Sequence, residues 1–233
     1  MVCCVDMLPN VESFNFFFDF LSPYSYFAWC WIREQKPFLE ERGPLIYTPV
    51  NLAPLIHAHG TLGPAEIEAK RNYLMKDCLR LSTVKNIEFN APSELPFNAL
   101  YALRISLKEV CGSKQFNVID LFYRAAWERG LNLGDDQLIR QLLSDACFPA
   151  QDWLELVGDK EIRRALKNNG KMALENGLFG LPSVVVQTDR GQELFWGRDS
   201  LEYLKMFVMG EDPLDININK DKLKHFQSSY KAL

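Results

Sequence analysis

The chain of 233 residues has six cysteines but no Cys-x-x-Cys pair. Without two thiols at that spacing, disulfide exchange by paired-cysteine chemistry is not expected. Four of the cysteines fall in expected helices and are predicted to be reduced and mostly buried: Cys30, Cys78, Cys111 and Cys147. Cys3 and Cys4 are adjacent in a segment expected to be a loose N-terminal tail.

The sequence also lacks a basic stripe, a long apolar run and a secretory signal. Its formal net charge is −4, so nucleic acid is not an expected partner. The apolar runs end well short of the ~20 residues that a membrane-spanning helix needs. The first residues lack a basic segment, and the aromatic run over 14–20 contains Asp19, which argues against a signal peptide. We therefore expect a cytoplasmic protein that binds neither nucleic acid nor a membrane.

Hydrophobic residues make up 48% of the chain, which is enough for a substantial core. The first stretch has a β-α-β pattern. A strand over 14–20 is nearly all aromatic, which suits a strand covered on both faces. A helix is expected from about 23 to 35, and a second strand over 45–50 follows the break at Gly43-Pro44. A parallel pair joined in this way is a right-handed crossover.

The middle stretch, about 62–177, shows helical periodicity and no convincing strand. Apolar stripes at helical spacing are interpreted as core faces. They predict helices near the following ranges: 67–81, 100–110, 116–127, 138–146 and 159–177.

The last stretch returns to strands. A β-branched strand over 183–187 and a partner over 193–196 flank a turn, which predicts an antiparallel hairpin. A closing helix is expected from Ser200 to about Met209, and the tail after Pro213 is expected to wrap the surface or to be disordered.

The predicted fold class is therefore α/β, a thioredoxin-like fold with a large helical insertion between the β-α-β and β-β-α halves. The thioredoxin-like domain would comprise 13–61 and 178–212. The inserted helical domain would be 62–177, and the C-terminal tail 213–233.

The turn Ser22-Pro23-Tyr24-Ser25 lies between the first strand and the first helix. In a thioredoxin-like protein this turn would carry Cys-x-x-Cys, and here both sulfur positions hold Ser. The N–H groups of the helix end favour negative charge, so the turn could hold a thiolate that belongs to another molecule. The alternative is a plain helix start, because Ser before Pro is also a good N-cap and first helical residue.

Several separated segments together resemble one family. Residues 18–26 resemble the opening of the 2-hydroxychromene-2-carboxylate isomerases and of the related kappa-class glutathione transferases. The loop 177–182 is similar to their cis-proline loop, and 196–199 to their Gly-x-Asp turn before the last helix. Residues 59–61 and 64–70 keep the family's spacing. The resemblance covers about 14–210 and implies a glutathione-dependent enzyme of the thioredoxin superfamily, usually a homodimer.

The resemblance also implies roles for individual residues. Ser22 would donate its hydroxyl to the sulfur of bound glutathione and so favour the thiolate. The Leu181-Pro182 bond would be cis, which is uncommon for X-Pro bonds, and would turn the Leu181 peptide groups toward the cysteinyl backbone of glutathione. An ordinary trans turn is the alternative at that loop.

The charged ends of glutathione would be held by further residues. Asp199 would accept from the α-ammonium of the γ-glutamyl group, although it could instead simply cap the last helix. The family often has Arg after this Asp, whereas here Ser200 follows and Arg198 precedes. Lys70 would pair with the glycine carboxylate, or else be a solvated helix lysine, and Thr61 replaces an amide residue of the kappa class.

Weaker arguments place Tyr24, Asn51 and His57 in the substrate pocket. His57 and His59 form a His-x-His pair without a third ligand motif, so no metal is expected. The predicted function is a glutathione-dependent isomerase that acts on a small aromatic acid, with glutathione as cofactor. The alternatives are a kappa-like glutathione transferase and a non-catalytic glutathione-binding dimer.

Overall fold

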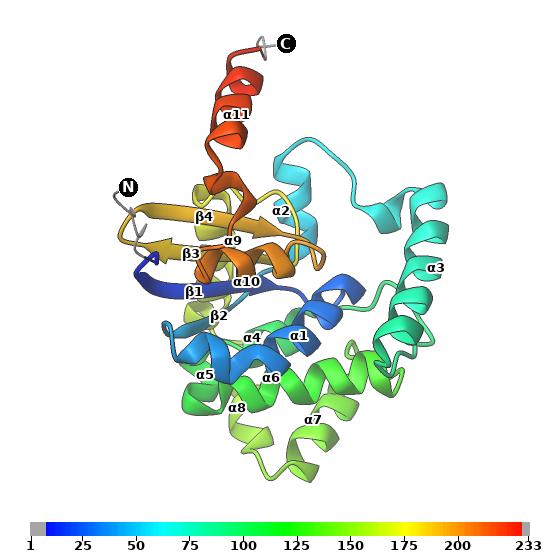
Figure 1. Cartoon of the computed structure of the whole chain (residues 1–233). Helices are drawn as coiled ribbons and strands as arrows, with labels where there is room; N and C mark the ends of the chain where they lie inside the picture. Colours follow the sequence, from blue (N-terminus) through cyan, green and yellow to red (C-terminus); the bar gives the residue numbers. More distant parts are fainter. Residues whose placement is uncertain (1–7, 230–233) are drawn as a thin grey trace.

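The computed structural model describes residues 8–229 and contains a four-stranded sheet (Figure 1). The strands are β1 (Val11–Phe18), β2 (Leu45–Pro49), β3 (Ser183–Thr188) and β4 (Gly191–Trp196), in the order β2-β1-β3-β4. β1 and β2 are parallel, whereas β3 is antiparallel to both β1 and β4. This is the thioredoxin arrangement, and the predicted fold class is confirmed.

The aromatic residues of β1 alternate between the two faces of the sheet, as the two-residue repeat of a strand requires. Phe14, Phe16 and Phe18 belong to the larger buried cluster on one face, and Phe17 belongs to the smaller cluster on the other. All four side chains are fully buried. The prediction of a strand covered on both faces is therefore confirmed.

The helices are α1 (Pro23–Glu40), α2 (Leu52–Ala58), α3 (Glu68–Lys85), α4 (Leu100–Ile105), α5 (Lys108–Cys111), α6 (Gln115–Tyr123), α7 (Asp136–Asp145), α8 (Ala150–Leu156), α9 (Lys160–Glu175), α10 (Leu201–Val208) and α11 (Asn217–Ser229). A π-helical turn over Arg124–Glu128 continues α6. α1 continues through Pro37 beyond the predicted end near 35. The periodicity did not predict α2 and α8, which are seven residues each.

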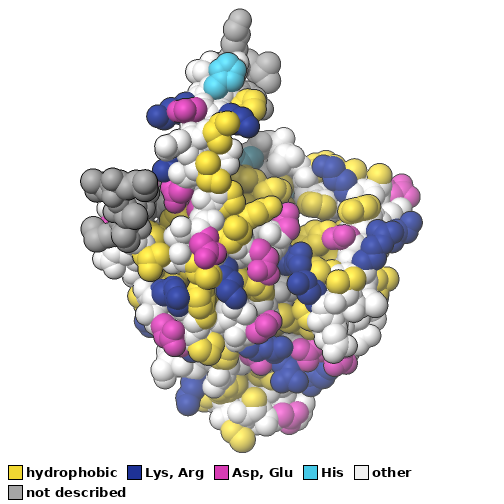
Figure 2. All heavy atoms as spheres, in the orientation of Figure 1, with side chains coloured by type: hydrophobic (Ala, Val, Ile, Leu, Met, Phe, Trp, Pro, Cys, Tyr) yellow, Lys and Arg dark blue, Asp and Glu magenta, His cyan; other side chains and the backbone are white. Residues whose placement is uncertain are grey.

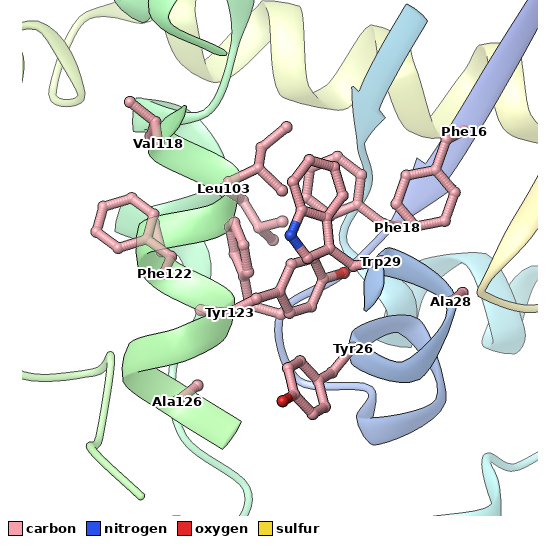
Figure 3. Packing of buried hydrophobic residues seen from close by; sticks show 14 of the residues in the cluster. Phe16, Phe18, Tyr26, Ala28, Trp29, Leu103, Val118, Phe122, Tyr123 and Ala126 are labelled. Carbon is pink, nitrogen blue, oxygen red and sulfur yellow. The ribbon is translucent and has the colours of Figure 1, made fainter. Parts of the chain in front are cut away.

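Helices cover both faces of the sheet. α10 lies in front of the sheet in Figure 1 and α9 behind it. The larger buried cluster joins β1 and α1 to the helical block, so the block and the sheet share one core. Figure 3 shows this contact, where Phe18 of β1 lies near Trp29 of α1 and Tyr123 of α6. The ring centroids of Trp29 and Tyr123 are 5.9 Å apart, which is a normal aromatic packing distance. The boundaries of the helical block stay a prediction.

Two sequence-based expectations are wrong. Residues 217–229 neither wrap the surface nor lack structure, because they form α11, which has no buried residue and projects from the body (Figures 1 and 2). Cys147 is exposed and follows the end of α7 in a positive-φ conformation, so it is not a buried helical thiol. Cys30, Cys78 and Cys111 are free and buried, as predicted. Cys3 and Cys4 lie outside the described residues.

The face drawn in Figure 2 carries Lys and Arg side chains interspersed with Asp and Glu. None of the helices between residues 8 and 229 combines the length and the apolar character that a bilayer crossing requires.

Candidate functional site

The strand register brings four connecting segments to one edge of the sheet. The end of β1 pairs with the end of β2 (Phe18 with Pro49) and with the start of β3 (Phe17 with Ser183). Ser183 in turn pairs with Trp196 at the end of β4. The turns after β1, β2 and β4 and the loop before β3 therefore emerge side by side. These segments carry Ser22, Asn51, the Leu181-Pro182 bond and Asp199.

Ser22 caps α1 at this edge. Its backbone is extended (φ −87°, ψ 115°), and its Oγ accepts a hydrogen bond from the N–H of Ser25 at 3.2 Å. Pro23 is the first helical residue, as the N-cap interpretation predicts. Within residues 8–229 the Ser22 hydroxyl donates to no atom, so its proton stays available to a ligand. Ser22 keeps 6% exposure, whereas Ser25 has none.

The helical block holds the backbone of this turn. The indole N–H of Trp127 donates to the carbonyl of Phe20 at 2.8 Å, and the Tyr123 hydroxyl donates to the carbonyl of Asp19 at 3.3 Å. The Asp19 carboxylate accepts from two backbone N–H groups, those of Leu21 at 2.9 Å and Leu52 at 2.7 Å. Sequence reasoning missed Asp19 as a site residue, although one charge in an otherwise aromatic buried run was a usable signal.

The Leu181-Pro182 bond is cis, as predicted. Within residues 8–229 neither the N–H nor the C=O of Leu181 takes part in a hydrogen bond, although its side chain is buried. The N–H of Gly197 donates to the carbonyl of Pro182 at 2.9 Å. On the other side, Nε2 of His59 donates to the carbonyl of Leu178 at 2.9 Å. The cis-proline loop is thus tied to the turn before α10 and to the end of α2.

The turn before α10 contains Gly197 with φ +86°, a conformation that favours glycine. The Ser200 hydroxyl donates to the carbonyl of Gly197 at 2.9 Å, so its proton is used within the turn. The N-cap residue of α10 is Ser200, without a side-chain bond, and no capping bond from Asp199 is present in the described part of the chain. The side chains of Arg198 and Asp199 have no hydrogen-bond or ion-pair partner within residues 8–229.

A cavity of about 370 Å³ lies next to the start of α1 and the first turns of α3. It is lined by Tyr24, Pro64, Ala69, Lys70, Tyr73 and Leu74. The Tyr24 hydroxyl donates to Oδ2 of Asp77 at 2.8 Å. Burial raises the pKa of Tyr24 above its ordinary value, and the bond to Asp77 raises it further. Tyr24 therefore stays neutral and fixed. The cavity wall is apolar apart from the Tyr24 and Tyr73 hydroxyls and the Lys70 ammonium, which has no ion-pair partner within residues 8–229.

Three predicted residues lie away from this cavity wall. Thr61 is exposed between α2 and the 3-10 turn over Pro64–Glu66. Asn51 is the N-cap residue of α2, and its side chain does not make the capping bond. His57 is exposed, with its Nε2 3.1 Å from Oε1 of Glu66. Residues 8–229 contain no cluster of three or more His, Cys, Asp or Glu side chains suited to a metal ion.

A larger cavity of about 510 Å³ lies on the helical block and contains none of the predicted site residues. Its charged walls pair with neighbouring side chains, since Asp120 pairs with Arg33 at 2.9 Å and Arg124 with Glu128 at 2.9 Å. It is therefore a weaker candidate site.

The buried cysteines do not supply a thiolate at neutral pH. Burial raises the pKa of Cys30 to about 11 and the pKa values of Cys78 and Cys111 to about 12. A thiolate at Ser22 would have to come from a ligand.

The geometry defines a thioredoxin-like protein in which Ser stands at the start of α1, beside a cis-proline loop. The chain belongs to the DSBA-like thioredoxin domain family, whose model matches residues 14–208. A 2-hydroxychromene-2-carboxylate isomerase of Sphingobium xenophagum is 26% identical over 211 residues, covering 85% of this chain and 98% of the relative. Glutathione S-transferase kappa 2 of Caenorhabditis elegans is 25% identical over 217 residues, covering 86% and 93%.

A solved structure of 2-hydroxychromene-2-carboxylate isomerase superposes with a TM-score of 0.75 at 19% identity, covering 95% of this chain and all of the other. The cytosolic disulfide reductase DsbM of Pseudomonas aeruginosa superposes with a TM-score of 0.60 at 13% identity, covering 92% and 99%. At these identities the structural likeness establishes the fold. The resemblance to the isomerase and kappa transferase group is confirmed, and the named relatives are enzymes.

Proposed function

We propose that the protein is a glutathione-dependent isomerase of the 2-hydroxychromene-2-carboxylate isomerase type. The observation that carries the proposal is Ser22, a helix-capping hydroxyl with an available proton at the same sheet edge as the cis-proline loop. A hydroxyl proton and a helix N-terminus both favour an anion. A bound thiol at this position would therefore be a thiolate at neutral pH, where a free thiol with a pKa of ~8.5 is mostly protonated.

The residues at this edge suit the chemistry of glutathione. The Leu181 peptide offers one donor and one acceptor without a protein partner in the described part of the chain, which matches the backbone of a cysteinyl residue. Asp199 is an exposed carboxylate without a partner among residues 8–229, suited to an ammonium group, and Arg198 and Ser200 stand on either side of it. The Lys70 ammonium suits a carboxylate, and Thr61 lies on the segment that leads to it.

Glutathione would supply a thiolate that adds reversibly to a conjugated carbon of an aromatic degradation intermediate, and it would be regenerated at the end. Ser22 would stabilise the negative sulfur through its hydroxyl proton. Leu181 would fix the cysteinyl backbone, so that the sulfur stays above the start of α1. The apolar wall formed by Tyr24, Tyr73 and Leu74 would accept the substrate ring, since flat apolar groups bury well against aromatic side chains.

The test is Ser22→Ala, with the pKa of the bound glutathione thiol followed by thiolate absorbance. Loss of a hydrogen bond to a charged group costs about 1.5–3 kcal/mol, which corresponds to a rise of about 1–2 pKa units. At a pH below the thiol pKa of the wild type, turnover with 2-hydroxychromene-2-carboxylate should fall roughly 10- to 100-fold, because the thiolate-to-thiol ratio falls by that factor. If the thiol pKa and the turnover both stay at wild-type values, Ser22 is only a cap and the proposal fails.

A matched control separates capping from chemistry. Asp135 caps α7 by accepting from the N–H groups of Gln137 and Leu138, in the helical block and outside the site. Asp135→Ala should lower stability by about 1 kcal/mol, as cap losses do, without moving the thiol pKa.

The second candidate is a kappa-like glutathione transferase, which the 25% identity to a kappa transferase favours. In that case the thiolate would attack an electrophile and stay attached. Assaying isomerisation of the chromene carboxylate beside conjugation of an aryl halide decides between the two activities. Glutathione binding without either activity would support a non-catalytic binding protein.

We also propose that the protein works as a cytoplasmic homodimer. A reducing compartment rich in glutathione suits the free cysteines and the proposed cofactor. Light scattering on the purified protein tests the assembly, and a monomeric mass would contradict it.

A further inference from the structure

Asp19 is a buried carboxylate without a basic partner among residues 8–229. Its exposed fraction is 1%, and it follows β1 directly. Aspartate is almost never buried in this way unless it is paired, because desolvation disfavours the charged form. Burial raises the pKa of Asp19 to about 6, although the two backbone hydrogen bonds act in the opposite direction. At neutral pH the fold therefore keeps an ionised carboxylate in a buried environment that disfavours its charge.

The two hydrogen bonds of this carboxylate join the turn after β1 to the start of α2, which is 33 residues from Asp19. Oδ1 accepts from the N–H of Leu21 at 2.9 Å, inside the turn that leads to Ser22. Oδ2 accepts from the N–H of Leu52 at 2.7 Å, at the first residue of α2. The N–H of Ser22 also donates to the carbonyl of Asp19 at 3.3 Å, so the side chain and the backbone carbonyl of Asp19 both hold the Ser22 turn.

α2 carries this restraint across to the cis-proline loop. Asn51 occupies the N-cap position of α2 but leaves the capping to Asp19. At the other end of α2, His59 donates to the carbonyl of Leu178, four residues before the proline. Asp19, α2 and His59 thus form a continuous connection behind the site, from the Ser22 turn to the loop that presents Leu181.

We propose that Asp19 is a positioning residue, whose carboxylate fixes the Ser22 turn against α2 and so sets the spacing between the Ser22 hydroxyl and the Leu181 peptide. The inference rests on the proposed function, because that spacing matters for a thiolate whose backbone is held at Leu181. Asp19 itself touches neither the thiolate nor the substrate.

None of the titratable groups described near Asp19 forms an ion pair with its carboxylate. On α6, Tyr123 faces it, and burial raises the pKa of Tyr123 well above its ordinary value, so this group stays neutral. On α1, Tyr24 is neutral and bonded to Asp77. On α2, His57 and His59 lie at the far end and contact Glu66 and the Leu178 carbonyl.

Asp19→Asn tests the role by the direction in which the pKa of bound glutathione moves. The amide keeps one acceptor and loses the other, so the connection that Asp19 makes between the Ser22 turn and α2 (the clamp) loosens. The thiol pKa should then rise by about one unit, which is a roughly tenfold fall in the thiolate-to-thiol ratio at a given pH. Removing a nearby negative charge without loosening the turn would lower the thiol pKa instead. A fall, or no change, therefore overturns the proposal.

Leu52→Pro removes the N–H that donates to Oδ2, together with the Leu52 side chain that packs on the smaller buried cluster, and it serves if the Asp19 variant does not fold. Proline is well tolerated at the first residue of a helix, and the extended backbone of Asn51 (ψ 115°) suits a residue before proline. Leu52→Ala is the matched control, since it keeps the N–H. The thiol pKa should rise by about one unit in the proline variant relative to the alanine variant. Equal values in the two variants would overturn the clamp.

Amide hydrogen exchange keeps this test separate from that of the proposed function. In Asp19→Asn the segments 19–26 and 51–59 should both exchange at least severalfold faster, although they are far apart in the sequence. Asp135→Asn, another carboxylate that accepts from two backbone N–H groups, should affect only the start of α7. If the wild-type protein binds no glutathione thiolate, the proposed function fails, while the exchange result still confirms or overturns the clamp.

Discussion

The turn before α1 and the turn before α10 both lead from a strand into a helix, but the fold holds them differently. Side chains from the helical block bind the first turn, and Ser22 is 6% exposed. The second turn is tied through Gly197 to Pro182, and its Arg198 and Asp199 side chains are partly or fully exposed. The turn proposed to stabilise a reactive sulfur is thus fixed by the core. The turn proposed to hold the charged end of a ligand presents charges without partners in the described chain.

The largest expected effect comes from loosening the first turn. Trp127→Phe removes the donor to the Phe20 carbonyl and leaves that buried carbonyl unsatisfied. With the volume lost from a fully buried ring, the free energy of unfolding should fall by roughly 3–4 kcal/mol, measured by denaturant unfolding.

Trp153→Phe is the matched control for this change. Trp153 is also buried in the helical block, but its indole N–H makes no hydrogen bond within residues 8–229. Trp153→Phe should lower the free energy of unfolding by roughly 1–2 kcal/mol. Equal losses in the two variants would show that the Phe20 bond contributes nothing, and the two turns would then not differ in this respect.

The second prediction concerns the pH dependence that Asp19 imposes on the first turn. Its pKa is about 6 in the folded state and near 3.8 when unfolded, so between these values the folded state holds a proton that the unfolded state has released. The free energy of unfolding should therefore decrease as the pH rises from about 4 to about 6. The total change is roughly 3 kcal/mol, since each pKa unit corresponds to about 1.4 kcal/mol.

Asp19→Asn isolates this contribution, because the other carboxyl groups titrate in both proteins. The difference in unfolding free energy between wild type and variant, measured by urea unfolding at several pH values, should change across this window and be constant above it. A difference that stays constant from pH 4 to pH 7 would contradict the prediction.

The two turns also differ in how far the sequence predicted them. Local sequence signals predicted both turns, because Ser22-Pro23 is a helix start and the cis-proline and Gly-x-Asp segments are short motifs. The contacts that fix the first turn come from distant residues. Leu52 is 33 residues from Asp19, and Trp127 is 107 residues from Phe20. A single sequence does not reveal such pairs.

The misplaced elements have the same kind of cause. α2 is seven residues long and contains Pro54, so its periodicity is too short to detect, and tertiary bonds at both ends hold it in place. Cys147 directly follows the apolar stripe over 138–146 and was counted with the predicted helix, but the chain turns there with φ +57°. α11 has a helical composition without a surface to pack on, which sequence reasoning took for a tail.

The smallest effect on stability is expected at the exposed charges. Lys70→Met and Asp199→Asn should each change the free energy of unfolding by less than about 0.5 kcal/mol, because neither side chain has a partner within residues 8–229. Each should weaken glutathione binding about tenfold through loss of a charge-assisted bond, as measured by calorimetry. The loss should shrink at high salt, which screens exposed charges.

Lys76→Met is the control for the lysine change, because Lys76 is exposed on the same helix and does not line the cavity. The affinity of the Lys76→Met variant for glutathione should match that of the wild type.

Since Lys70 and Asp199 lie on different elements and share no partner, their effects on binding should add in the double variant. If either variant lost stability and kept its affinity, the exposed charges would be structural. The contrast between a fixed turn and an open recognition turn would then be wrong.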